Sequence, residues 1–137
     1  MTFELRDHTA DVAVEATAST LSDVFADVAA GLTAAMCDSW PDEGDRFSIE
    51  ETAESREALL FDYLDRLIYE RDVREVLPVD HRCDVQETPE DEWTLSASAR
   101  GIPFESVTAR DIKAVTYSQM RLESRDDGWY AYVVFDV

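Results

Sequence analysis

The sequence predicts an α+β fold: a two-layer domain in which two main helices pack on one face of a mainly antiparallel sheet. Two long stretches carry apolar residues at helical three-four spacing. Several shorter stretches alternate apolar and polar residues, as half-buried strands do, and turn-forming segments separate them. At 137 residues the chain is expected to form one domain, residues 1–137, around one core.

The N-terminal part predicts two strands around a turn. Residues 3–6 and 12–16 alternate in part, and residues 8–11, His-Thr-Ala-Asp, interrupt them. Asp11 therefore lies where the turn enters the second strand. An Asp at such a position commonly bonds local amides, and it can also hold a cation.

Two stretches predict amphipathic helices, and core packing is the expected role of both apolar faces. In residues 21–36 the apolar positions are Leu21, Val24, Phe25, Val28, Leu32 and Met36. In residues 55–73 they are Leu59, Leu60, Tyr63, Leu64, Leu67 and Ile68. The first helix is expected to end near Cys37, before an acidic loop that contains Pro and Gly.

The remaining strands are expected at residues 46–50, 76–85 and 93–99, within 113–124, and at 130–137. Residues 88–92 are expected to close a hairpin, and Asp126-Asp127-Gly128 to supply the last turn. Gly101-Ile102-Pro103 is expected to break the strand before it, because proline is disfavoured inside a central strand.

The charge of the chain disfavours direct binding to nucleic acid. The sequence has 31 acidic and 12 basic residues, for a formal charge of −19, which repels phosphates. The acids are scattered and Lys113 is the only lysine, a composition that suits a halophilic protein working in concentrated salt. A basic partner would also explain the charge, but its binding face would gather the acids.

Cysteine usage and the N-terminus predict a cytoplasmic protein with no membrane partner. Cys37 and Cys83 fit neither a metal-ligand spacing nor a disulfide framework. The first residues lack the pattern of a signal peptide, and no apolar run approaches the roughly 18 residues that span a membrane.

The C-terminal residues predict a metal site, whereas the familiar catalytic motifs are missing. The chain as given ends on an apolar strand followed by Asp136 and Val137, which places a side-chain carboxylate beside the α-carboxylate. Together with Asp11 these groups would offer three or more hard oxygen donors. Such donors suit a hard divalent cation, calcium or magnesium, better than zinc.

Two histidines and one lysine are further candidates. His8 is three residues from Asp11, although a hydrogen-bonded turn histidine is the commoner role. His81 lies in a polar patch and is interpreted as an ordinary surface histidine. Lys113 is either required as an ammonium or has simply escaped replacement by arginine, and composition does not decide between the two.

Five segments together resemble the archease family, and the resemblance covers nearly the whole chain. They are HTAD at 8–11, MCD at 36–38, LLFDYLDRLI at 59–68, DIKAVTY at 111–117 and VFDV at 134–137. The resemblance implies a non-catalytic tRNA-splicing accessory protein that activates an RtcB-type RNA ligase, promoting its guanylylation and multiple turnover. It also implies that RNA is contacted only through the ligase.

The resemblance assigns roles to individual residues. It implies that Asp11, Asp136 and Val137 hold calcium, the set already reached from donor chemistry. It ties Lys113 to ligase activation and places His8 in the motif of Asp11. Many members have a histidine where this chain has Ser118, so no role is carried over to that position.

Two other functions stay open at this point. A stand-alone metal-dependent hydrolase acting on nucleotides or RNA would use the same carboxylates to activate water. A generic chaperone-like adaptor would not need them, so mutation of Asp11 separates it from an activator.

Overall fold

The described chain alternates strands with two long helices. The computed structural model of the protein describes residues 2–7 and 11–137. Its elements are β1 (Thr2–Asp7), β2 (Asp11–Ala18), α1 (Leu21–Met36), β3 (Asp45–Ala53), α2 (Arg56–Arg74), β4 (Val76–Glu87), β5 (Trp93–Pro103), the 3₁₀ turn η1 (Phe104–Ser106), β6 (Ala114–Val115), β7 (Arg121–Arg125) and β8 (Gly128–Asp136). Every strand pairing is antiparallel within these ranges.

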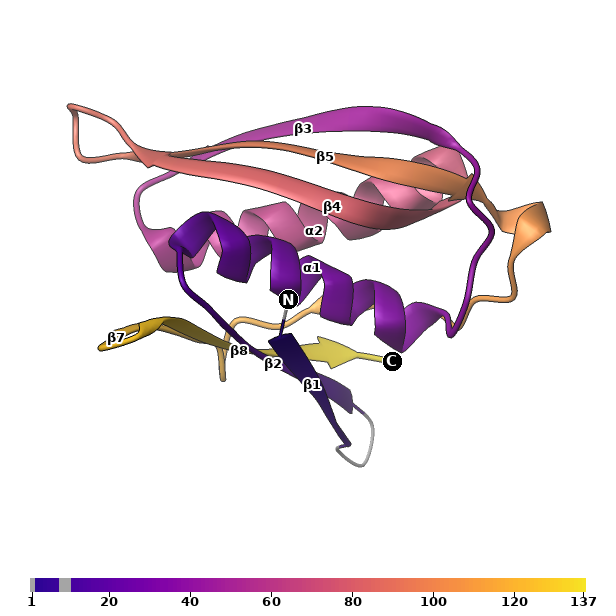
Figure 1. The fold of residues 1–137 in the computed structure, drawn as a ribbon, viewed down its shortest axis with the longest axis horizontal. Helices are drawn as coiled ribbons and strands as arrows, with labels where there is room; N and C mark the ends of the chain where they lie inside the picture. Colours follow the sequence, from indigo (N-terminus) through magenta and orange to yellow (C-terminus); the bar gives the residue numbers. More distant parts are fainter. Residues whose placement is uncertain (1, 8–10) are drawn as a thin grey trace.

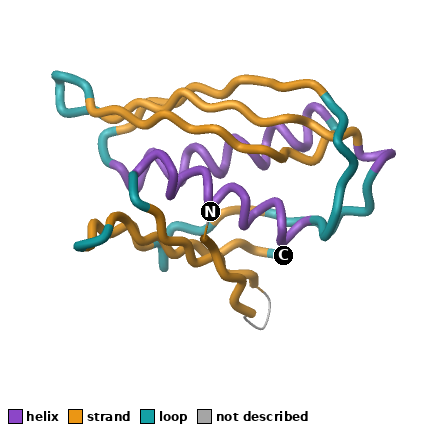
Figure 2. Tube along the Cα trace, in the orientation of Figure 1, coloured by secondary structure: helices purple, strands orange, loops and turns teal. Residues whose placement is uncertain are grey.

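The strands form two sheets with the helices between them (Figures 1 and 2). One sheet has the order β1-β2-β8-β6, with β7 also paired to β8, and the other has the order β3-β5-β4. The predicted α+β class, with antiparallel strands and two main helices, is confirmed. The layering differs from the expectation, because the strands divide into two sheets and do not form a single sheet with helices on one face.

Helix α1 explains this division, because it is buried on more than one side. Gly31 faces Val14 of β2, where a Cβ atom would collide with the valine side chain. Thr33, nearly opposite on the helix, donates a hydrogen bond from its hydroxyl to the Pro78 carbonyl of β4 at 2.7 Å. One helix therefore contacts both sheets.

Both helices begin at side-chain caps. The Thr20 hydroxyl accepts a hydrogen bond from the Asp23 amide at 3.1 Å, and Ser55 accepts one from Ala58 at 3.0 Å. Such caps contribute about 1 kcal/mol each. The bounds of α1 match the prediction, and α2 runs one residue beyond it to Arg74.

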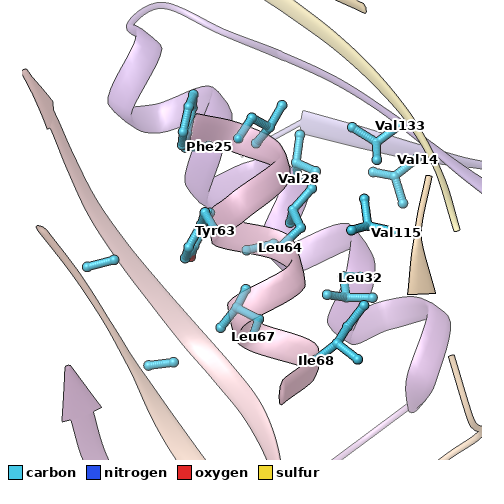
Figure 3. Packing of buried hydrophobic residues seen from close by; sticks show 14 of the residues in the cluster. Val14, Phe25, Val28, Leu32, Tyr63, Leu64, Leu67, Ile68, Val115 and Val133 are labelled. Carbon is cyan, nitrogen blue, oxygen red and sulfur yellow. The ribbon is translucent and has the colours of Figure 1, made fainter. Parts of the chain in front are cut away.

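The core lies between the helices and the sheets. Figure 3 shows Val14, Val115 and Val133 of the five-stranded sheet beside Val28 and Leu32 of α1. Each of the five is at most 6% exposed, and burial of such a side chain stabilises the fold by about 1.5–3 kcal/mol. This packing fixes β2, β6 and β8 side by side.

The expectation that Gly101–Pro103 ends the preceding strand is wrong. Strand β5, the central strand of its sheet, continues to Pro103, which pairs with Val76. Proline is tolerated there because it is the last residue of the strand. The region 113–124, expected to hold one strand, holds β6 and β7.

His81 is buried, so its interpretation as a surface histidine is also wrong. The register of β4 shifts between Val79 and Arg82, and Asp80 takes a φ of 55°. A bulge of this kind changes which way a side chain points. His81 is only 8% exposed, and its Nε2 lies 2.7 Å from the hydroxyl of Thr33.

The buried imidazole of His81 is neutral. The Thr33 hydroxyl lies 2.7 Å from the Pro78 carbonyl and 3.2 Å from the Ala29 carbonyl. We assign its single proton to the shorter of these bonds and the imidazole proton to Nε2, which then donates to Thr33. Burial lowers the pKa of His81 from 6.5 to about 4, with Arg46 lowering it and Asp80 opposing the shift.

Acid is therefore expected to destabilise the protein through His81. The unfolded chain binds a proton at this position near its ordinary pKa of 6.5, whereas the folded chain binds one only near 4. Stability is thus lost as the pH falls from 6.5 towards 4, with about 2 kcal/mol gone by about pH 5. Urea unfolding at about pH 7.5 and about pH 5 measures the loss, which should be smaller in His81→Gln. Equal losses in both proteins would contradict this assignment.

Candidate metal centre and the segment beside it

Two carboxylates lie opposite each other at one end of the five-stranded sheet. Asp11 begins β2, Asp136 ends β8, and the two are Cα partners in the antiparallel register. Directly opposed residues of an antiparallel pair place their side chains on the same face, with Cβ atoms about 4.5–5.5 Å apart. The structure thus brings together residues 125 positions apart in the sequence, from 11 to 136.

Strand alternation places this pair on the outer face of the sheet. Val14 and Phe135 belong to the core beside the helices, so Asp11 and Asp136, at odd offsets from them, project to the other side. Asp11 is half-buried and Asp136 is exposed. Like charges directly opposite destabilise a sheet, so a cation between them would remove a repulsion.

The donor set fits a hard divalent cation. The two side-chain carboxylates offer up to four oxygens, and the main-chain carbonyl of the adjoining Val137 is a further oxygen donor. Within residues 2–7 and 11–137, no three His, Cys, Asp or Glu side chains gather as a metal site. Calcium takes six to eight oxygen ligands, so water or a partner group would complete its shell.

Lys113 reaches the same end of the sheet through its main chain. Strand β6 lies on the other side of β8, where Ala114 is the Cα partner of Asp136. The Lys113 amide donates to the Asp136 carbonyl at 2.9 Å. Its neighbour Ile112 is buried, whereas the Lys113 side chain is exposed. The main chain of Lys113 is therefore held beside Asp136, and the lysine side chain is exposed to solvent.

Two arginines hold the segment that leads to Lys113. Arg110 donates from Nε to the Ala35 carbonyl at 3.0 Å at the C-terminal end of α1, where its charge complements the helix dipole. The guanidinium of Arg71, itself buried, lies 3.3 Å from Asp111. The sequence pattern did not point to either arginine. The only available signal was that Arg110 directly precedes the DIKAVTY segment and that Arg71 closely follows the LLFDYLDRLI segment.

The structure brings some of the site residues predicted from the sequence close together, but not all of them. The strand register brings Asp11 and Asp136 together, Val137 follows Asp136 in the sequence, and Lys113 is joined to Asp136 by a main-chain hydrogen bond. His8, the fifth candidate, lies outside the described residues. Cys37 and Cys83 carry free thiols, as expected.

The comparison with known proteins connects this geometry to a family. The chain matches the family described as "Archease protein family (MTH1598/TM1083)" over residues 3–137. The chain belongs to the archease family. Protein archease of Thermococcus gammatolerans is 35% identical over 142 aligned residues, which cover 98% of each chain. Protein archease of Methanosarcina barkeri is 33% identical over 143, covering 98% of this chain and 95% of the relative.

Solved structures share the archease fold. The solution structure of Methanobacterium thermoautotrophicum protein 1598 superposes with a TM-score of 0.84 at 29% identity and covers 98% of both chains. An archease from Thermotoga maritima, described as a possible chaperone, superposes with a TM-score of 0.64 at 19% identity, covering 100% of this chain and 98% of its own. At 19% identity that likeness shows the fold alone. In the described chain, no helix is long and apolar enough to cross a membrane.

Proposed function

We propose that this protein is a non-catalytic activator of an RtcB-type RNA ligase in tRNA splicing, and that it binds calcium at one end of its fold. The single observation that carries the proposal is the register that sets Asp11 opposite Asp136, with Lys113 hydrogen-bonded to Asp136. These are the residues to which the archease resemblance assigns a role. The protein would act in the cytoplasm and reach RNA only through the ligase.

The proposed action is electrostatic. Asp11, Asp136 and Val137 would hold the cation, and the cation would supply a fixed positive charge at the ligase active site. Lys113 would present an ammonium beside it, held by the buried Ile112 and by the amide bond to Asp136. Preorganised charges of this kind stabilise a reaction without forming bonds themselves. The step assisted would be the guanylylation of the ligase.

Guanylylation of the ligase tests this proposal. The cognate ligase is incubated with radiolabelled GTP and manganese at high salt, with and without this protein. We expect faster labelling with the wild type and little stimulation with Asp11→Ala. Asp127→Ala, an exposed position in the β7–β8 turn, is the matched control. Absence of stimulation by the wild type would overturn the proposal.

The same variants separate the two other functions. A stand-alone hydrolase would turn over RNA or nucleotides without the ligase. A generic chaperone-like adaptor would protect the ligase equally well as wild type and as Asp11→Ala, because protection of that kind does not use the carboxylates. Turnover and aggregation assays on the two proteins therefore identify which function is present.

High salt is expected to stabilise this protein. A net charge of −19 causes self-repulsion in dilute buffer, and at about 1 M salt the Debye length falls to about 3 Å. The melting temperature should therefore rise from about 0.1 M to about 2 M potassium chloride. A melting temperature that falls or stays flat over this range would contradict the interpretation that the composition suits concentrated salt.

A further inference from the structure

Three apolar side chains are the most exposed of their kind in the described chain, and all three lie on or beside α2. The exposed fractions are 60% for Val73, 57% for Tyr69 and 50% for Tyr117. Tyr69 and Val73 are one turn apart on α2, while Tyr117 follows β6. Exposed apolar residues that gather in one region mark interaction sites more often than single scattered ones do.

Two contacts lay the segment 111–117 alongside α2. At one end, Asp111 pairs with Arg71 at 3.3 Å. At the other end, the Tyr117 ring packs against Phe61 with centroids 5.4 Å apart. Because residues 61 and 71 of the helix are about 15 Å apart, the segment runs along more than two turns of α2. Tyr117 therefore lies against the helix that also carries Tyr69 and Val73, at its Phe61 end.

Two acids complete this surface. Asp62, Asp65, Tyr69 and Val73 follow at spacings of three and four residues, so they form one stripe of the helix. The nearby arginines are engaged elsewhere: Arg66 pairs with Glu51 and Glu70, and Arg74 with Glu70. Among the described side chains, no ion pair reaches Asp62 or Asp65.

The two acids repel each other in the free protein. Partial burial raises the pKa of Asp62, and the charge of Asp65 raises it further. A positive charge brought near the pair would relieve this repulsion. A phosphate would increase it, so the stripe favours a basic protein segment over RNA. A second copy of this surface would likewise oppose like charges.

We propose that the α2 face, defined as Asp62, Asp65, Tyr69, Val73 and Tyr117, binds a basic amphipathic segment of the ligase. The inference rests on the proposed function and extends the contact beyond the metal site. Arginine or lysine side chains of that segment would lie against Asp62 and Asp65, and its apolar side chains would cover the two tyrosines and the valine. A segment bound along the face would cover about 16 Å of helix.

The segment 111–117 connects this face to the metal centre. It carries Tyr117 at one end and Lys113 near its middle, and the Lys113 amide is bonded to Asp136. One partner surface could therefore contact the α2 face and the metal centre together. Binding at the face would position the ligase while Lys113 and the carboxylates act at its active site.

Charge reversal and truncation at the face test this proposal. The double variants Asp62→Lys/Asp65→Lys and Tyr69→Ala/Val73→Ala alter exposed or half-buried side chains, and unchanged thermal melting in both would show that the fold is kept. The affinity for the intact cognate ligase is measured by biolayer interferometry at high salt, with calcium affinity measured in parallel. We expect at least about a tenfold loss of ligase affinity in each variant, with calcium affinity unchanged. The matched control is Glu87→Lys/Glu90→Lys, which makes the same charge change on exposed acids near the β4–β5 hairpin.

The outcomes separate this proposal from the function on which it rests. If the wild type stimulates guanylylation and both α2-face variants keep wild-type ligase affinity, the face is not the docking site and the proposed function still stands. If the wild type neither binds nor stimulates the ligase, both proposals fail. If the Glu87→Lys/Glu90→Lys control lost as much ligase affinity as the α2-face variants, the loss would be a general charge effect, and the docking site would be overturned. Sedimentation showing that two copies of this chain associate through the α2 face would also overturn the docking site.

Discussion

Replacing Asp11 with alanine is expected to weaken calcium binding by at least about tenfold without unfolding the protein. The loss follows from removing one of about three proposed charged ligands, because calcium affinity depends on the number of charged ligands. The fold should survive because Asp11 lies at the first position of β2, on the outer face of the sheet and away from the helices. Loss of the repulsion between Asp11 and Asp136 offsets part of the lost cation stabilisation.

Changes at the other two proposed ligands, Asp136 and Val137, should weaken calcium binding in the same way. Asp136→Ala removes the opposite carboxylate. A short polar tag after Val137 converts a carboxylate into a peptide carbonyl, which keeps one oxygen but loses a full negative charge. Calorimetric calcium titration compares these proteins with the wild type, and Asp127→Ala, at the far end of β8, controls for the general loss of an acid. Wild-type calcium affinity in the tagged protein would remove Val137 from the metal site.

Lys113→Arg is expected to reduce ligase activation by at least about tenfold while the protein folds normally. The substitution keeps the charge but replaces a compact, rotatable ammonium with a planar guanidinium. The main chain of residue 113 should be unaffected, because its bond to Asp136 uses the amide and its neighbour Ile112 stays buried. The effect should therefore appear in the rate of guanylylation and leave the melting temperature unchanged.

The reverse exchange at another site provides the control for Lys113. Arg82 is exposed on β4, in the other sheet, and Arg82→Lys should leave both activation and stability as they are. Full activation by Lys113→Arg would show that the single lysine of this chain has no special role.

The sequence predicted the two helices well because the residues that mark a helix lie within the helix and at its ends. Thr20 and Ser55 cap the two helices, and the three-four spacing of the apolar residues marks their length. The division into two sheets was not predictable in the same way. Strand alternation shows that a strand is half-buried, but not which strand lies beside it. The position of α1 between the two sheets depends on contacts of Gly31 with β2 and of Thr33 with β4, which the sequence pattern does not show.

The candidate site was predictable in its residues but not in its arrangement. Donor chemistry selected Asp11, Asp136 and Val137, and the composition selected Lys113, whereas the pairing of Asp11 with Asp136 depends on the long-range register of β2 and β8. The burial of His81 was missed because a bulge turns a residue from the exposed face towards α1, and alternation cannot anticipate a bulge. The sequence pattern of α2 predicted its buried apolar side and gave no signal for the exposed residues of the α2 face.

A ligation time course tests the central claim most directly. The cognate ligase is given tRNA halves, GTP and manganese in excess at high salt, and this protein is added at a small fraction of the ligase concentration. The proposed function predicts many ligated products per molecule of ligase, with Asp11→Ala and Lys113→Arg falling towards the level of the ligase alone. Product that stops at about one per ligase molecule, with or without this protein, would contradict the account.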